Sequence, residues 1–188
     1  MEIATRRLLL RDFRESDRNA FLAYQADRRY LALYGRETAD PAHASELLQT
    51  FEQWASEQPR RNYQLAIIER SSEELVGCCG LRSAGCDRAS AELGFELAPE
   101  YWGRYGYAIE APGALLAFGF DKLGLREIYG VTASGNTRVA RLARWFGGDA
   151  TAPSPGPAWM LARGWSQVEW RITSEQWRAR AATRSWRR

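Results

Sequence analysis

The most informative part of this 188-residue chain is the stretch AELGFELAPEYWGRYGYAIEA, residues 91–111. Its first part reads as a strand that ends at Pro99, and Gly103 and Gly106 then open a helix. The first N–H groups of a helix have no partner within it, and the helix dipole adds partial positive charge there. Because glycine lets a ligand approach the backbone closely, this turn suits an anion such as a pyrophosphate, with Arg104 adding a charged contact.

The glycine spacing excludes two common phosphate-binding motifs. No Gly-Lys-Ser/Thr follows the turn, so it is not a nucleotide P-loop. Gly103 and Gly106 also lack the first Gly-x-Gly pair of the dinucleotide fingerprint. Taken alone, a Gly-x-x-Gly turn is equally typical of an ordinary connection between a strand and a helix.

Working outward, the periodicity of apolar residues predicts a mixed sheet. We expect strands over residues 5–13, 63–70, 75–82, 91–97, 127–133, 159–162 and 167–172. We expect helices over 17–27 (capped by Ser16), from Asp40-Pro41 through Trp54, from 103–106 to about 123, over 136–146 and at the C-terminus. The order predicts an α/β mixed sheet with helices on both faces. Since no linker separates two parts, residues 1–188 are expected to form one domain.

The composition excludes several classes of protein. With 45% hydrophobic and 26% charged residues the chain is globular, and a net charge of +3 is too small to indicate a nucleic-acid partner. No window approaches the about 20 apolar residues of a membrane span and no N-terminal apolar run appears, so we expect a cytoplasmic protein. The only histidine is His43, and the adjacent Cys78 and Cys79 point to opposite faces of a strand, so no metal site is expected.

With its flanks, the central stretch resembles the acyl-CoA signature of the GNAT N-acetyltransferase superfamily. It looks most like the branch that includes the ribosomal-protein alanine (RimJ/RimL-type) acetyltransferases. Residues 5–13 resemble the first strand of that branch, Asn136 matches its Asn at a helix start, and residues 168–177 are similar to its last strand and terminal Trp. The resemblance implies a single GNAT domain, with a mostly antiparallel sheet whose strands splay apart, and acetyl-CoA as co-substrate.

The resemblance also implies where acetyl-CoA would bind. A V-shaped opening is expected where the strand ending at Leu97 splays from the strand near Tyr129. The backbone of Phe95, Glu96 and Leu97 would pair with the pantetheine amides. The turn would hold the pyrophosphate with Gly103, Arg104, Tyr105, Gly106, Tyr107 and Ala108, and Asn136 would lie near the thiol.

Acetyl transfer to an amine needs a neutral amine and a proton for the leaving thiolate. Glu92 is the first candidate for the general base, and Glu96, on the same face by period two, is the second. A salt-bridged or solvated strand glutamate is the alternative for either. No tyrosine follows Tyr129, where many relatives carry a tyrosine acid, so Ser134 or water must serve.

Three other departures from the family pattern stand out. Tyr105 is an extra residue in the turn, Val139 replaces a serine of the relatives, and Pro112 falls inside a predicted helix, which it should kink or shorten.

The expected acceptor is a protein N-terminal or similar primary amino group, contacted by Tyr34, Arg36 and Glu37. The alternatives are a small amine (an aminoglycoside, an amino acid or a polyamine) and a non-catalytic acyl-CoA-binding module. We expect acetyl-CoA and the acceptor as partners, no membrane or nucleic acid, and a monomer or homodimer. Trp54, Trp159, Trp165 and Trp170 fit helix stripes and strand alternation, so we expect them in the core rather than at the site.

Overall fold

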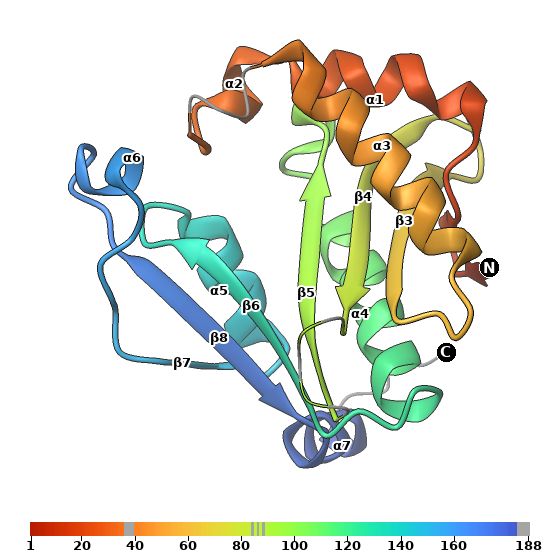
Figure 1. Ribbon diagram of the computed structural model, residues 1–188. Coiled ribbons are helices and arrows are strands. Elements are labelled where there is room, and N and C mark those ends of the chain that lie inside the picture. Colours follow the sequence, from red (N-terminus) through yellow and green to blue (C-terminus); the bar gives the residue numbers. More distant parts are fainter. Residues whose placement is uncertain (36–39, 84, 86, 88, 184–188) are drawn as a thin grey trace.

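The computed structural model describes residues 1–35, 40–83, 85, 87 and 89–183 (Figure 1). An eight-stranded sheet has the order β1-β2-β3-β4-β5-β6-β8-β7. The strands are β1 (Glu2–Ala4), β2 (Leu8–Arg11), β3 (Asn62–Glu69), β4 (Leu75–Arg82), β5 (Ser90–Leu97), β6 (Glu127–Ala133), β7 (Asp149–Ala150) and β8 (Gln167–Thr173). All neighbouring strands are antiparallel except β5 and β6, which run parallel. The mixed, mostly antiparallel sheet is therefore confirmed.

Helices cover both faces of the sheet and create two apolar cores. On one face lie α1 (Arg18–Gln25), α2 (Arg28–Leu31) and α3 (Pro41–Ser56), whose core includes Phe21, Tyr30 and Phe51. On the other lie α4 (Tyr105–Asp121), α5 (Thr137–Trp145) and α7 (Ser174–Thr183), around the α4 core that also includes Trp177. The short α6 (Ala158–Leu161) stands beside the open ends of β6 and β8 (Figure 1).

The sequence pattern located most of these elements. The predicted bounds of β4 and β6 agree with the structure, and α3 begins at Pro41 with the Asp40 carboxylate accepting from the backbone N–H of Ala42 at 2.9 Å. Ala44, Leu48 and Phe51, which form an apolar stripe at helical spacing along α3, are buried. The helix predicted over 136–146 is α5, with Asn136 as its N-cap residue.

Two local predictions were wrong, at the start of α1 and at residues 159–162. Ser16 does not cap the first helix, because the Asp17 carboxylate binds Arg11 and the backbone N–H of Arg14, which stabilises a 3₁₀ turn (Glu15–Asp17) ahead of α1. Residues 159–162 are not a strand: Pro157 starts the helix α6, and β7 pairs with β8 instead. Pro112 lies inside α4 without shortening it, since the helix continues to Asp121 and the proline is buried in the core.

The sheet opens between its two parallel strands. β5 and β6 pair only where Ser90, Ala91 and Glu92 face Glu127, Ile128 and Tyr129. Beyond that point β5 follows β4 to Leu97, whereas β6 follows β8, and the strands diverge (Figure 1). The predicted V-shaped opening is present, and it leaves one edge of the second half of β5 without a partner strand among the described residues.

Candidate functional site

Two cavities meet at the opening between β5 and β6. The cleft cavity, of about 370 Å³, lies between the two strands and continues toward α3 on one face and α5 on the other. The helix cavity, of about 440 Å³, lies between the start of α4 and α5. The residues that line both cavities are Leu33, Tyr34, Phe95, Glu96, Asn136, Val139 and Leu142. A group bound in one cavity can therefore reach a group bound in the other across this shared wall.

The helix cavity is electropositive. Arg104, Arg138 and Arg141 line it, and Glu96 at the shared wall is the one acidic residue among its described lining residues. Trp102 and Trp145 add flat apolar surfaces, and the Arg138 guanidinium lies 5.0 Å from the Trp102 ring. Arginines next to aromatic rings suit a ligand with phosphates and a planar base.

The turn before α4 has the conformation that glycine permits. Gly103 has a φ of +90°, in the left-handed region, and a Cβ at this position would meet no atom within 4 Å. Gly106 has a different role, because a Cβ there would lie 2.1 Å from Arg7 Nη2. Of the predicted turn residues, Gly103, Arg104 and Ala108 line the helix cavity, whereas Gly106 and Tyr107 do not. Tyr105 is the first residue of α4.

Glu110 fixes Arg7 against this turn. Its carboxylate accepts from the backbone N–H of Arg7 at 2.6 Å, from Arg7 Nε at 2.8 Å and from the Thr5 hydroxyl at 2.6 Å. Burial alone raises the pKa of Glu110, but the hydrogen bonds from Thr5 and Arg7 outweigh burial and lower that pKa. Tyr107 points into the core instead, where its hydroxyl donates to Glu69.

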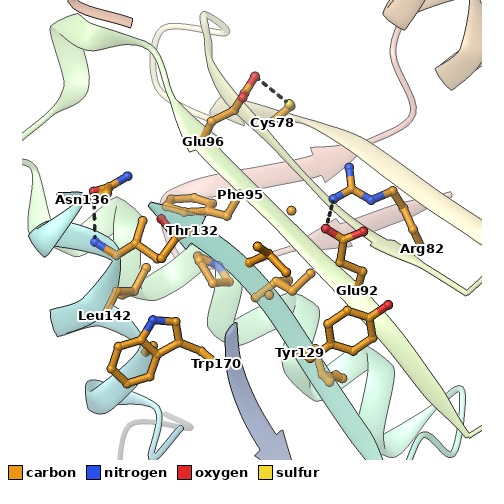
Figure 2. Close-up of a pocket in the computed structure, with 18 of the residues that line it drawn as sticks. Cys78, Arg82, Glu92, Phe95, Glu96, Tyr129, Thr132, Asn136, Leu142 and Trp170 are labelled. Atoms are coloured by element: carbon orange, nitrogen blue, oxygen red, sulfur yellow. Dashed lines mark hydrogen bonds and ion pairs between the residues drawn. The ribbon is translucent and has the colours of Figure 1, made fainter. Parts of the chain in front are cut away.

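The open edge of β5 forms the wall between the turn and the cleft. Phe95 and Leu97 pack on the α4 face, and Phe95 lines both cavities. The Leu97 carbonyl accepts from the Trp102 indole N–H at 2.8 Å, which ties the turn to the strand. Asn136 accepts at Oδ1 from the backbone N–H of Val139 at 3.4 Å and so caps α5 at the shared wall (Figure 2).

Glu96 is held on the opposite face of β5 by a shell of neutral donors. Its Oε1 accepts from Tyr24 at 2.7 Å, Gln25 at 2.6 Å and Cys78 at 3.3 Å, and its Oε2 accepts from Tyr30 at 2.6 Å and Tyr34 at 3.4 Å (Figure 2 shows the Cys78 contact). Burial is the main cause that raises the pKa of Tyr24, Tyr30, Tyr34 and Cys78, so these groups stay protonated and donate. A carboxylate has about four lone-pair sites, so these five donors occupy the hydrogen-bond acceptor capacity of Glu96.

The other predicted catalytic residues lie farther from the shared wall. Glu92 lines the cleft cavity alone and forms an ion pair with Arg82 Nη2 at 3.1 Å (Figure 2). Ser134 lines neither cavity, because its hydroxyl accepts from the backbone N–H of Ser166 at 3.0 Å. Tyr34 lines both cavities, while Arg36 and Glu37 lie outside the described residues. The structure thus brings Tyr34, Glu96 and Asn136 together and leaves Ser134 apart.

Several residues that line the two cavities were not predicted from the sequence as site residues. Arg138, Arg141 and Trp145 stand at positions i, i+3 and i+7 of α5 and so share one helix face, a signal that could have located the basic wall. Trp54, Trp159 and Trp170, expected in the core, also line the cleft cavity, whereas Trp165 packs edge-on against Trp159 with ring centroids 6.5 Å apart.

Neither a metal cluster nor a membrane helix is found in the described part of the chain. No three His, Cys, Asp or Glu side chains there gather as metal ligands. No helix there has the length and apolar character to span a bilayer.

The sheet opens between two parallel strands, and a basic cavity meets a cavity with carboxylates at the gap, an arrangement that can hold an anionic and a cationic ligand side by side. Residues 7–149 match the acetyltransferase (GNAT) domain family, and the chain belongs to this family of N-acetyltransferases. The predicted family is therefore confirmed.

Similar proteins support this membership. The chain is 32% identical over 141 residues to the uncharacterized N-acetyltransferase YoaA of Bacillus subtilis (strain 168), covering 74% of this chain and 78% of that protein. It is 27% identical over 141 residues to the uncharacterized N-acetyltransferase p20 of Bacillus licheniformis, covering 73% of this chain and 76% of that protein.

Solved structures share the fold. A GNAT-family acetyltransferase from Bacillus anthracis superposes with a TM-score of 0.76 at 23% identity, covering 93% of this chain and 99% of that one. Spermidine N-acetyltransferase from Vibrio cholerae, in complex with CoA and spermine, gives 0.74 at 18% identity, covering 92% and 99%. A Vibrio cholerae protein provisionally named a ribosomal-protein-serine acetyltransferase gives 0.71 at 20% identity, covering 92% and 97%.

Proposed function

We propose that this enzyme transfers the acetyl group of acetyl-CoA to the N-terminal α-amino group of a polypeptide, as expected for the RimJ/RimL-type branch. The observation that carries the proposal is the shared wall, at which a basic cavity and a cavity containing carboxylates meet. The provisional name of one structural neighbour, a ribosomal-protein-serine acetyltransferase, points to the same class of acceptor.

The residues present fit acetyl-CoA in the helix cavity. Arg104, Arg138 and Arg141 supply charge for its phosphates, and the open backbone at Gly103 allows close approach. The unpaired edge of β5 offers hydrogen-bonding groups for the pantetheine amides. The Vibrio cholerae relative that contains CoA shares this fold, which also supports the assignment. The bound thioester supplies an activated acetyl group at the shared wall.

The surroundings of Glu96 favour an α-amine over a lysine-like amine. An α-amino group has a pKa of about 7.7–8.0, so roughly a tenth of it is neutral at pH 7, whereas a lysine amine has a pKa of about 10.4. The carboxylate of Glu96 can pair with an ammonium group, but five donors already occupy its lone pairs, so we do not assign it the role of a strong base. An acceptor that loses its proton to water without a strong base suits this site best.

The proton balance then needs no tyrosine acid. The ammonium group loses one proton to solvent before attack, and a second proton passes from the nitrogen to the departing thiolate as the C–N bond forms and the C–S bond breaks. Burial, and after it the charge of Glu96, raise the pKa of Tyr34, so its phenol stays protonated and positions Glu96 rather than donating to the sulfur.

A set of matched acceptors tests the proposal. We expect calorimetry to show acetyl-CoA binding, and release of the CoA thiol to occur with a peptide whose α-amine is free. The same peptide with a blocked α-amine and a free lysine, and spermidine, should both react much more slowly. Failure to bind acetyl-CoA, or equal turnover of the lysine peptide, would contradict it.

A further inference from the structure

The half of the cleft cavity that faces α1–α3 is where the acceptor would enter, and we call it the acceptor half. Glu92 and Tyr129 are register partners in the parallel ladder, so their side chains point to this same face. Tyr34 and Trp54 pack against the core on that face, and Phe51 belongs to it. The opposite half, with Phe95 and Trp170, faces α4 and α5.

Aromatic rings dominate the wall of the acceptor half. Tyr34, Phe51, Trp54 and Tyr129 line it, and Trp159 of α6 adds a fifth ring. Trp159 is fixed in place, because the Arg163 guanidinium lies 5.1 Å from its ring and donates to the Tyr34 carbonyl at 2.9 Å. An apolar group that binds against these rings removes their surface from water, which favours binding.

The charged residues of the cleft cavity can balance one positive charge on a bound acceptor. Among the described residues that line it, the charged ones are Arg82, Glu92 and Glu96. Arg82 forms an ion pair with Glu92, which leaves one uncompensated negative charge, on Glu96 (Figure 2). One ammonium group is therefore balanced, whereas a second would be desolvated against aromatic rings with no described carboxylate to pair it.

We propose that the enzyme selects polypeptides whose first residue has a bulky apolar side chain, such as phenylalanine or leucine, and discriminates against a first residue with a second positive charge. The inference rests on the proposed function and names the acceptor of that same site. The α-ammonium group contacts Glu96 and displaces the longest of its five contacts, that of Tyr34. The apolar side chain then packs against the aromatic rings that line the acceptor half.

The test uses peptides that differ only in their first residue, which is Phe, Leu, Ser or Lys. We expect kcat/KM, measured by release of the CoA thiol, to be at least about tenfold higher for Phe and Leu than for Ser, with Lys the poorest. Equal rates, or a preference for Ser or Lys, would overturn the inference while leaving the proposed function intact. Comparing the rates for phenylalanine amide and for the Phe peptide shows whether the enzyme prefers a small amine or a polypeptide as acceptor.

Binding gives a second readout that does not depend on turnover. With CoA at saturation, the Phe peptide should bind at least about tenfold more tightly than the Ser peptide in calorimetry. If no peptide is acetylated, the proposed function fails, but this comparison of binding still decides the inference.

Two variants of α6 provide a matched pair. Trp159→Ala removes a ring of the wall and should lower kcat/KM for the Phe peptide several-fold, while the Ser peptide changes by less than about twofold. Leu161→Ala, on the same helix but 55% exposed and outside the cavity, should leave both peptides unchanged. Trp54→Phe keeps an aromatic ring at the wall and serves as a conservative control. It should retain the preference for the Phe peptide over the Ser peptide. Unchanged discrimination in Trp159→Ala would contradict the assignment of this ring to the wall.

Discussion

Replacing Glu96 by glutamine tests the role of this half-buried carboxylate. Glu96→Gln keeps the shape of the side chain and removes its charge. At an effective dielectric constant of about 20, an ammonium 4 to 8 Å from a carboxylate gains about 2 to 4 kcal/mol. Losing that attraction lowers kcat/KM for the amine about 30- to 1,000-fold. The loss should fall mainly on KM, because Glu96 holds the acceptor and is not the main proton acceptor.

The structural cost of the same change is smaller. The amide offers one acceptor oxygen, so part of the donor shell loses its acceptor, but the Tyr30 and Tyr34 hydroxyls can rotate to accept from the new NH₂ group. We expect a loss of about 1–3 kcal/mol in the free energy of unfolding, measured with urea. The Kd of acetyl-CoA should stay within about twofold, because the cofactor contacts lie on the other face.

Glu92→Gln is the matched control on the same strand. It removes a carboxylate that lines the cleft cavity alone and is already paired with Arg82. Its effect on kcat/KM should be several-fold smaller than that of Glu96→Gln. The reasoning is refuted if Glu96→Gln retains activity within threefold of the parent, or if Glu92→Gln is the more damaging change.

Three further perturbations follow from contacts elsewhere. Arg138→Gln and Arg141→Gln should each raise the Kd of CoA about tenfold and flatten its dependence on salt. Arg178→Gln, at an exposed position of α7, should change neither in the same titration. Asp17→Ala leaves Arg11 buried without this partner and should lower the free energy of unfolding in urea by about 3–5 kcal/mol. Glu2→Gln, which breaks the exposed ion pair with Arg14, should lower it by about 0–1 kcal/mol. Equal losses would contradict the argument from burial. Arg163→Ala frees α6 from the Tyr34 carbonyl and should raise KM for the peptide several-fold with little change for acetyl-CoA, and an unchanged KM would show that this contact does not shape the cleft.

The elements were predictable where local chemistry agrees with the final packing. The stripe of α3 and the Asp40-Pro41 start predicted that helix, since cap, proline and apolar face point the same way. The strand at 159–162 failed because alternation over four residues cannot outweigh Pro157, which starts a helical turn. The start of α1 failed because the Asp17 carboxylate binds Arg11, a partner that a scan for caps does not consider.

The site was predictable in type but only partly in its members. The turn at Gly103 and the acidic face of β5 follow from spacing and strand period. Which of Glu92 and Glu96 lies at the shared wall could not be read from the sequence, because it depends on where β5 diverges from β6. The donors to Glu96 come from α1 and α2, far from it in the chain, and only the folded packing brings them together.

A crystal structure of the protein with bound CoA would show whether the cofactor occupies the gap between β5 and β6. We predict that the pyrophosphate lies against Gly103 and Arg104, that Arg138 and Arg141 contact the phosphates, and that the thiol ends at the wall formed by Phe95, Glu96 and Asn136. A CoA molecule bound away from the gap between β5 and β6, or one whose thiol points away from Glu96, would contradict it.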